Sequence, residues 1–467
     1  MNVKNLHSVY FLGIGGIGMS AIARWFAHIG VPVFGYDKTP SPLTETLESE
    51  GMHVSYRDDP DQIPAAFLQT DTKKTLVIWT PAVPQSSALF RFFTDQGYTL
   101  MKRSAVLGLI TKSMETVAVA GTHGKTTTSS MIAHLLKNAG HNTAAFLGGL
   151  TQNYQSNLIL HDEGSKEAPV VVVEADEFDR SFLQLHPNVS IVTSIDPDHL
   201  DIYGDPDHFL EGFLAFIRLT NPTGQLFIQH RAYEKIKDRE YGTVPVRTYG
   251  LDTGSIRAEN IQAGTITFSF DYCSETERID DLNLHVPGFH NIENALAAIA
   301  AARYFGLSEN AIKEGIASYR GVKRRFEFIH SGETITYIDD YAHHPEEIRS
   351  FLHSVKAMYP AKRLTAVFQP HLFTRTRDFA AGFSESLSLA DEVLLLDIYP
   401  AREMPLPGVT AAMLLPAISS PVKRILEKEA LLPYLKQRPP EVLVTIGAGD
   451  IDRLVEPIAK WIADERT

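Results

Sequence analysis

The sequence predicts an α/β protein of three domains, because short apolar segments typical of buried strands alternate with amphipathic helical segments along the chain. Two of the predicted strands run into glycine-rich loops, at 13–18 and 121–124, and a helical segment follows each loop. A third region repeats the alternation and places polar residues after each strand. At 467 residues, 44% of them hydrophobic, the chain is long enough for three cores.

The composition narrows the classes of partner and compartment. A formal charge of −13 argues against a nucleic-acid partner and favours small-molecule substrates. The single cysteine, Cys273, excludes an internal disulfide framework and a cysteine-based metal cluster, which fits a reducing cytoplasm. No apolar run reaches about 18 residues and no export signal opens the chain, so we expect no membrane association. We expect a cytoplasmic monomer or weak homodimer.

Residues 1–112 are predicted to form an N-terminal Rossmann-like domain. An apolar strand at 9–12 enters the loop 13–18, whose glycines precede a helix. A second strand, at 31–36, ends at Asp37, close to where a ribose-binding acid is expected, and a later strand at 76–79 ends at Thr80. The pattern favours a nucleotide-type ligand, and close helix packing is the alternative explanation of the glycines.

Residues 113–325 are predicted to form a central ATPase-type domain with a phosphate-binding loop. A strand at 116–120 leads into Gly121 and Gly124, and then into Lys125 and Thr126 at the start of a helix. Glycines let backbone N–H groups approach a phosphate, the lysine neutralises its charge, and the threonine hydroxyl can bind Mg²⁺. Only two residues separate the glycines instead of the usual four, so an ordinary glycine turn remains the alternative.

Carboxylates follow the next buried strand of this domain, at 170–173. Glu174, Asp176 and Glu177 come directly after it, where parallel sheets place their ligands. They are expected to hold the Mg²⁺ that bridges nucleotide oxygens, and a solvated acidic turn is the alternative. A further strand at 189–195 precedes Asp198 and His199. This histidine either binds a metal or is an ordinary core or capping residue.

Two more features of the central domain have both a structural and a functional explanation. His290 and Asn294 lie at the start of a helix, where such residues often serve as caps. Arg324 and Arg325 form a basic cluster in an acidic protein, which is either a solvated patch or a phosphate contact.

Residues 326–467 are predicted to form a C-terminal Rossmann-like domain. Its strands at 334–338, 364–368, 392–396 and 442–446 alternate with helices. Each strand ends in polar residues, which a parallel sheet brings to one edge. Four such groups on one edge predict a binding site.

Taken in order, these motifs resemble those of the Mur ligase family. The matching stretches are 121–128, 174–177, 196–199, 288–294, 324–326, 339–345 and 369–371, so the resemblance covers the whole chain. The loop 13–18, His123 and the run 339–345 are similar to the branch that joins L-alanine to UDP-N-acetylmuramate. A recycling branch that attaches a tripeptide is the alternative, although the run 178–183 is nearer the alanine branch.

The resemblance implies an ATP-dependent ligation through an acyl phosphate, in peptidoglycan precursor synthesis. The implied substrates are UDP-N-acetylmuramate, L-alanine and ATP, with two Mg²⁺ ions, and the implied catalytic residues are Lys125, His199 and Arg325. The implied metal ligands are Thr126, Glu174 and His199. The implied ATP-binding residues are Gly121, Thr122, His123, Gly124, Lys125, Thr126, Thr127, His290, Asn294, Arg325 and Asp340. The implied UDP-sugar-binding residues are Gly13, Gly15, Gly16, Ile17, Gly18, Met19, Asp37 and Thr80, and the amino-acid-binding residues are Tyr341, His343 and Arg375.

The chain departs from the family pattern at two places. Several relatives use a carbamoylated lysine after the metal histidine, but no lysine lies between Lys166 and Lys235 here, and the alanine branch is similar in lacking it. The family commonly has arginine at the position of Leu372, so Arg375 or Arg377 has to bind the alanine carboxylate.

Two other classes of protein share parts of the pattern. A nicotinamide-dependent oxidoreductase would use the loop 13–18 and Asp37 but would leave Lys125 and Glu174 without a role. A non-catalytic nucleotide switch would need the phosphate loop but not the polar strand ends of the third domain.

Overall fold

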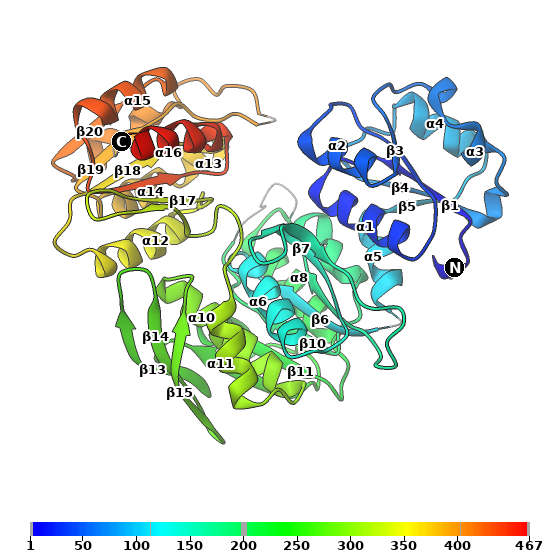
Figure 1. Cartoon of the computed structure of the whole chain (residues 1–467), viewed down its shortest axis with the longest axis horizontal. Helices are drawn as coiled ribbons and strands as arrows, with labels where there is room; N and C mark the ends of the chain where they lie inside the picture. The colour runs from blue at the N-terminus through cyan, green and yellow to red at the C-terminus, as the bar shows by residue number, and fades with distance from the viewer. Residues whose placement is uncertain (1–2, 113, 198–202, 402, 465–467) are drawn as a thin grey trace. The chain divides into compact units, whose positions relative to one another are not determined.

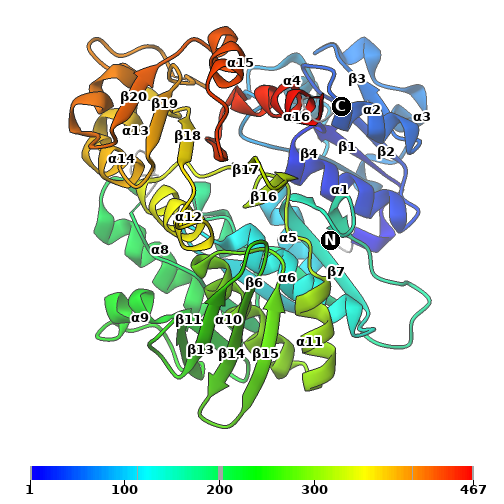
Figure 2. The same ribbon diagram turned by 60° about the vertical axis from the view of Figure 1, so that its left-hand side comes forward.

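The computed structural model describes residues 3–112, 114–197, 203–401 and 403–464, and Figures 1 and 2 show its ribbon from two directions. The chain divides into two compact units, which are described separately. The first unit comprises Met1–Arg257, Ser274–Thr276 and Asn294–Gly315. The second comprises Ala258–Cys273, Glu277–Glu293 and Ile316–Thr467.

The first unit begins with a five-stranded parallel sheet in the order β3-β2-β1-β4-β5. Its strands are β1 (Ser8–Leu12), β2 (Val33–Tyr36), β3 (His53–Ser55), β4 (Thr75–Trp79) and β5 (Leu100–Lys102). The helices are η1 (Val3–Asn5), α1 (Ile17–His28), α2 (Pro42–Ser49), η2 (Pro60–Gln62), α3 (Ala65–Leu68), η3 (Thr72–Lys74), α4 (Ala88–Asp95) and α5 (Arg103–Thr111). β1 is the middle strand, and all five of its residues are buried.

The register of this sheet explains why residues far apart in sequence meet. Leu12, the last residue of β1, pairs with Tyr36 of β2 on one side and with Trp79 of β4 on the other. The loop 13–18, Asp37 and Thr80 therefore leave the sheet together at its carboxyl edge. Because the strand order reverses at β1, this edge is where open α/β sheets bind ligands.

The central sheet of the first unit has the strand order β12-β11-β10-β6-β9-β7-β8. Its strands are β6 (Glu115–Ala120), β7 (Thr143–Thr151), β8 (Ser156–Ile159), β9 (Val170–Glu174), β10 (Val189–Val192), β11 (Gln225–Gln229) and β12 (Val246–Gly250). The helices are α6 (Lys125–Asn138), η4 (Phe178–Gln184), α8 (Pro206–Arg218) and α9 (His230–Ile236). β6 pairs in parallel with β9 and with β10, so the loop 121–124 leaves between Glu174 and Thr193.

Most residues of three strands that lie side by side in both views belong to the second unit: β13 (Ile256–Ala263), β14 (Phe268–Ser274) and β15 (Arg278–Leu284). Two helices, α10 (Phe289–Tyr304) and α11 (Glu309–Ser318), have residues in both units. β14 and β15 pair antiparallel, with an irregularity between Phe270 and Tyr272.

A six-stranded sheet in the order β16-β17-β21-β18-β19-β20 forms the rest of the second unit. Its strands are β16 (Glu327–Ser331), β17 (Thr336–Asp340), β18 (Leu364–Phe368), β19 (Glu392–Leu395), β20 (Val422–Ile425) and β21 (Val442–Ile446). The helices are α12 (Pro345–Met358), α13 (Phe373–Asp378), α14 (Ala380–Leu387), η5 (Ala411–Ala417), α15 (Lys428–Gln437), η6 (Asp450–Leu454) and α16 (Val455–Asp464). Ile446 of β21 pairs with Asp340 and with Phe368, so the segments after β17 and β18 leave at one edge.

The predicted strands are found, and the ends of three of them are shifted by two residues or more. The strand expected at 31–36 begins at Val33, after Pro32, which has no N–H to donate to a neighbouring strand. The strand expected at 189–195 ends at Val192, after which Thr193 bonds to the phosphate loop. The strand expected at 334–338 is Thr336–Asp340, because the Gly332 N–H donates to Ile335 O and closes a turn there.

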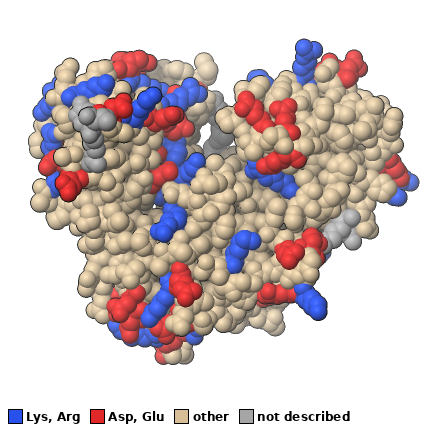
Figure 3. All heavy atoms as spheres, in the orientation of Figure 1, with Lys and Arg blue, Asp and Glu red and all other residues tan. Residues whose placement is uncertain are grey.

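The charged side chains do not gather by sign on the face shown in Figure 3, where Lys and Arg are interspersed with Asp and Glu. Among the described residues, no helix combines the length and apolarity needed to cross a membrane.

Candidate nucleotide and amino-acid sites

Only glycine fits at positions 121 and 124, because a Cβ at either would clash with neighbouring atoms. This tight packing favours a phosphate loop over an ordinary turn. Gly121 has φ +141°, and a Cβ there would lie 2.0 Å from Thr193 Oγ1. Gly124 has φ +79° and caps α6, where a Cβ would lie 2.7 Å from Asn294 Oδ1. No side chain caps this end of α6, so its first N–H groups point toward any ligand in the loop.

The other predicted residues of this loop are held by hydrogen bonds within the first unit. The Thr122 hydroxyl donates to Asp196 O at 2.7 Å, and the His123 N–H donates to Ser194 Oγ at 2.8 Å. Thr127 lies in the first turn of α6 and is buried. Asn294 accepts a hydrogen bond from the Thr128 hydroxyl at 3.0 Å, which places this predicted ATP-binding residue beside α6.

Lys125 is held in the loop by a buried carboxylate. Its ammonium donates to Gly121 O at 2.6 Å and lies 2.8 Å from Glu177 Oε2, whose side chain is only 2% exposed. Burial lowers the pKa of Lys125, but the charges of Glu177, Glu174 and Asp176 outweigh burial and raise that pKa, so the ammonium stays protonated. Sequence reasoning noticed Glu177 within a run of carboxylates but did not assign it this partner.

Thr126 and Glu174 form a donor set that suits Mg²⁺. The Thr126 hydroxyl donates to Glu174 Oε2 at 2.8 Å, and the Gly148 N–H donates to the same oxygen at 2.9 Å. Within the described residues, no cluster of three or more His, Cys, Asp or Glu could hold a metal. Mg²⁺ commonly takes one or two protein oxygens together with phosphate oxygens and water. His199, the third predicted ligand, lies outside the described residues.

The predicted UDP-sugar-binding residues gather at the carboxyl edge of the N-terminal sheet. Asp37 Oδ2 accepts the Gly15 N–H at 2.7 Å, and a Cβ on Gly13 would lie 3.0 Å from Thr80 Cγ2. A Cβ on Gly18 would lie 2.6 Å from Arg103 Nη1, so this glycine is needed for close packing as well. Gly16 caps α1 without a side-chain hydrogen bond, Ile17 begins that helix and is 39% exposed, and Met19 is buried.

Arg325 is presented by a strained turn at the start of the C-terminal sheet. Its neighbours Arg324 and Phe326 both have left-handed backbones, with φ of 61° and 50°. The guanidinium carbon of Arg325 lies 5.1 Å from the centre of the Tyr341 ring. Asp340 fixes the turn, because its carboxylate accepts the N–H groups of Phe326 and Ala342 at 2.7 Å each. Burial raises the pKa of Asp340 to about 6, against the opposing charge of Arg325.

His290 belongs to the second unit and Asn294 to the first. Burial lowers the pKa of His290 to about 4, and Arg325 adds to this shift while Glu347 opposes it. The ring is therefore neutral at physiological pH. Its Nδ1 is buried and has no hydrogen-bond partner among the described residues. A neutral imidazole can donate or accept one further hydrogen bond, which suits contact with an uncharged nucleobase.

The three predicted amino-acid-binding residues lie in the second unit near His371 and Tyr399, two polar residues that follow predicted strands. Arg375 Nη1 lies 3.4 Å from His371 Nδ1, and the His371 ring stacks on Tyr399 with centres 5.8 Å apart. His343 lies 6.2 Å from His371, between ring centres, and 5.6 Å from Tyr341. His371 was visible in a motif, but Tyr399 is brought here only by the parallel bridge between His371 and Tyr399.

We expect His343 to be neutral near pH 7. Burial lowers its pKa to about 4, Arg375 and Arg325 contribute, and Glu347, 3.5 Å from Nδ1, opposes them. Because the folded-state pKa lies below the ordinary value of about 6.5, the folded state binds fewer protons between these values. Stability should therefore fall as the pH falls from about 6.5 to about 4. The unfolding temperature of His343→Gln, relative to that of the wild-type protein, should therefore be higher at pH 5 than at pH 7.5. An equal difference at both pH values would contradict the assignment.

Comparison with known proteins matches this arrangement along the whole chain. The family models described as "Mur ligase family, catalytic domain", "Mur ligase middle domain" and "Mur ligase, glutamate ligase domain" match residues 8–114, 119–302 and 324–449. The UDP-N-acetylmuramate–L-alanine ligase of Cytophaga hutchinsonii is 46% identical over 100% of this chain and 99% of its own length.

Solved structures share the fold. The UDP-N-acetylmuramate-alanine ligase of Thermotoga maritima superposes with a TM-score of 0.78 at 29% identity, covering 98% of this chain and 99% of that one. A murein peptide ligase from Psychrobacter arcticus has a TM-score of 0.66 at 22% identity, covering 97% and 98%. The three family domains follow one another with parallel sheets in each, which confirms the predicted three-domain α/β fold. The chain belongs to the Mur ligase family.

Proposed function

We propose that this chain is an ATP-dependent ligase that joins the amino group of L-alanine to the carboxylate of UDP-N-acetylmuramate. The observation that carries the proposal is full-length similarity to a ligase with that name, at 46% identity, in a chain that also builds the Lys125 loop. The alternative of a nicotinamide-dependent oxidoreductase is wrong, because the family models identify a ligase.

The proposed reaction has two steps. A carboxylate oxygen of UDP-N-acetylmuramate attacks the γ-phosphorus of ATP, the bond from that phosphorus to the bridging oxygen breaks, and ADP leaves. The nitrogen of L-alanine then attacks the carbon of the acyl phosphate, phosphate departs with the C–O bond electrons, and the amine loses a proton. Such in-line transfers depend on positioning and charge neutralisation more than on a covalent protein residue.

The phosphate loop supplies both requirements. Lys125 carries a positive charge that Glu177 holds at the loop, where it would neutralise the β- and γ-phosphates. The N-terminus of α6 offers N–H groups to the same anion. Arg325 and Asp340 would contact the γ-phosphate and the ribose, while His290 and Asn294 would contact the adenine.

Thr126 and Glu174 would hold one Mg²⁺ ion. When bound, the ion would neutralise charge on the phosphate oxygens. A second ion at His199 remains a prediction. The protein's own contribution is to fix the Glu174 carboxylate between the Thr126 hydroxyl and the Gly148 N–H.

We predict that Gly148→Ala weakens this metal site. A Cβ on Gly148 would lie 2.5 Å from Glu174 Oε2 and would push the carboxylate away from Thr126. Displacing such a supporting contact typically costs about 10- to 100-fold in metal affinity, so the Mg²⁺ concentration for half-maximal activity should rise by about tenfold. Gly164→Ala is the matched control, because its Cβ would meet only an exposed Asp162 carboxylate at 3.3 Å. An unchanged Mg²⁺ requirement in Gly148→Ala would count against the site.

The remaining assignments follow the same proposal. The diphosphate of UDP-N-acetylmuramate would bind the loop 13–18 at the N-terminus of α1, and Tyr341, His343 and Arg375 would surround L-alanine. The enzyme would act in the cytoplasm on small molecules, in peptidoglycan precursor synthesis, as a monomer or weak homodimer. The domain limits 1–112, 113–325 and 326–467 remain part of the proposal.

Release of phosphate from ATP tests the function. It should require both UDP-N-acetylmuramate and L-alanine, and UDP-N-acetylglucosamine should not replace the former because it lacks the carboxylate. A parallel reaction with the tripeptide L-alanyl-γ-D-glutamyl-meso-diaminopimelate in place of L-alanine distinguishes the recycling activity from ligation of L-alanine. Faster release with the tripeptide than with L-alanine would overturn the proposal in favour of recycling, and release without any amino acid would overturn ligation.

A further inference from the structure

Asn157 is a buried asparagine of the central sheet that contacts the helix following the loop 13–18. It lies on β8, which pairs with β7, and α1 packs against both strands. Figures 1 and 2 both show α1 beside β7. The Asn157 Nδ2 donates to Ile17 O at 2.6 Å, and the Asn157 Oδ1 accepts from Arg24 Nη1 at 3.4 Å. The assignments above give this asparagine no role.

The orientation of the Asn157 amide is fixed by the groups that face it. A backbone carbonyl can only accept a hydrogen bond and a guanidinium can only donate one, so Nδ2 must face Ile17 and Oδ1 must face Arg24. Arg24 is held in turn by Glu50, whose Oε2 lies 2.7 Å from the Arg24 Nε. Because leaving a buried amide group unsatisfied is costly, both contacts tie Asn157 to α1.

The carbonyl that Asn157 binds belongs to the same peptide group as the Gly18 N–H. α1 begins at Ile17 without a side-chain cap, and the two N–H groups after that of Gly18 donate to Gly16 O. The N–H groups of Ile17 and Gly18 are therefore the ones that α1 offers to a ligand in the loop 13–18.

Two side chains donate to Ile17 O. The Ser20 hydroxyl donates to it at 2.9 Å, in addition to the Asn157 amide. Hydrogen bonds to a peptide carbonyl polarise that peptide group, which makes its N–H a stronger donor, an effect of roughly 10–30% per bond. An anion bound at the Gly18 N–H would be held more tightly for this reason.

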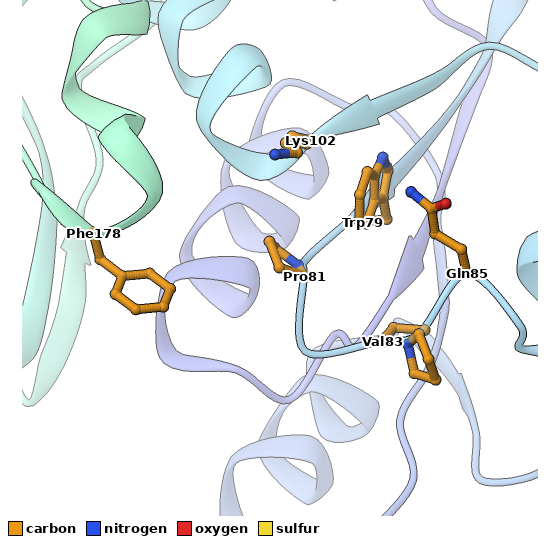
Figure 4. Close-up of a pocket in the computed structure, with 7 residues that line it drawn as sticks. Trp79, Pro81, Val83, Gln85, Lys102 and Phe178 are labelled. Carbon is orange, nitrogen blue, oxygen red and sulfur yellow. The ribbon is translucent and has the colours of Figure 1, made fainter. Parts of the chain in front are cut away.

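Asn157 is 0% exposed, so it acts on a ligand through α1 and not by contact. Figure 4 shows the pocket that adjoins the loop 13–18. Val83 lines this pocket, and its Cγ2 lies 3.2 Å from the position that a Cβ on Gly13 would take. The described residues that line the pocket do not include Asn157; they are Trp79, Pro81, Val83, Pro84, Gln85, Lys102 and Phe178.

We propose that Asn157 is a positioning residue for the diphosphate of UDP-N-acetylmuramate: its amide fixes the first turn of α1 and, through Ile17 O, strengthens the Gly18 N–H that would bind the phosphate oxygens. This inference rests on the proposed function, which takes the UDP-sugar as the ligand of the loop 13–18. It gives β8, a strand of the central sheet, a part in binding the substrate of the N-terminal sheet.

The other end of α1 provides a matched control. His28 is the last residue of the helix, and its Nε2 donates to His161 O at 3.0 Å. His161 follows β8 in the chain, so this contact also joins α1 to the central sheet. His28→Ala removes a contact of the same kind and leaves Ile17 O untouched.

Calorimetry with UDP, which carries the diphosphate without the sugar, measures the effect. Asn157→Asp keeps the shape of the side chain but replaces the donor at Nδ2 by an oxygen that repels Ile17 O. Its affinity for UDP should fall at least about fivefold, whereas His28→Ala should stay within about twofold of wild type. An affinity within about twofold of wild type in Asn157→Asp would overturn the proposal, and so would an equal loss in His28→Ala.

Steady-state kinetics distinguish a positioning role from a general loss of structure. Asn157→Asp should raise the KM for UDP-N-acetylmuramate by about the same factor as it weakens UDP, while kcat and the KM for ATP stay within about twofold of wild type. The reason is that α1 contributes to the loop 13–18 and not to the phosphate loop. Equal losses in the KM values for ATP and UDP-N-acetylmuramate would contradict the role.

Ser20→Ala provides the test if Asn157→Asp does not fold. It removes the other donor to Ile17 O from within α1, where alanine favours the helix, and it keeps the contact between Asn157 and Ile17. The affinity for UDP should fall about threefold with little change in unfolding temperature. An unchanged affinity for UDP would then overturn the proposal.

The reaction and the role of Asn157 can fail independently. If phosphate release does not depend on L-alanine but Asn157→Asp selectively weakens UDP, the role of Asn157 stands and the reaction does not. If ligation is confirmed and Asn157→Asp binds UDP as the wild-type protein does, only the role of Asn157 is overturned.

Discussion

Lys125→Ala should reduce ligation by at least about a thousandfold, because the variant loses the charge that we propose neutralises the phosphates in the transition state, where electrostatic stabilisation is usually the largest single contribution. The ammonium is already at the loop, bonded to Gly121 O and Glu177, so no rearrangement is needed to place it. The initial rate of phosphate release at saturating substrates measures the effect. Activity within about threefold of wild type would exclude the phosphate-loop assignment.

The same substitution should also destabilise the protein, which the sequence alone did not predict. The Lys125 side chain is 14% exposed and pairs with a carboxylate that is 2% exposed. Removing one partner leaves a buried charge, which is strongly destabilising. The double variant Lys125→Ala with Glu177→Gln removes that charge and should recover most of the lost thermal stability without recovering activity.

A second control separates charge at the loop from charge in general. Lys137 lies on the same helix, α6, and its ammonium is bonded to Leu160 O at an exposed position. Lys137→Ala should keep nearly full activity and stability. A comparable loss in both lysine variants would show that the effect of Lys125→Ala is not specific to the phosphate loop.

The strand ends were the part of the site most accessible to sequence reasoning. Unbroken apolar runs such as 170–173 and 442–446 are typical of strands buried on both faces. A polar residue directly after such a run is easily recognised as the end of the strand. Because parallel pairing aligns these ends, Glu174 and Asp340 were placed at the correct edges before their partners were known.

The antiparallel strands and the contacts between distant residues were much harder to predict. β15 contains Arg278, Asp280 and Asp281, so its alternating pattern is weak beside the apolar central strands. The pairing of Lys125 with Glu177 and the stacking of His371 on Tyr399 depend on loop geometry, which strand periodicity does not determine. Arg324 and Phe326 have left-handed backbones although neither is glycine, so the sequence does not mark this turn.

The departure at Leu372 is partly explained by the backbone around it. Leu372 has φ 70° and caps α13, and its N–H donates to Tyr399 O at 3.0 Å. The helix begins at Phe373, one turn before Arg377, so Arg375 and Arg377 leave it in different directions. Arg375 is partly buried beside His371, whereas Arg377 is 53% exposed and bonded to its neighbour Asp378.

Arg375→Ala should therefore raise the KM for L-alanine by about 10- to 150-fold, the loss expected for one charge-assisted hydrogen bond of roughly 1.5 to 3 kcal/mol to a carboxylate. The KM values for ATP and UDP-N-acetylmuramate should change little, since other residues are assigned to those substrates. Arg377→Ala is the matched control, because it removes the same group two residues away from an exposed position. Measuring all three KM values for both variants tests the assignment, and an alanine-specific defect confined to Arg377→Ala would transfer the carboxylate contact to Arg377.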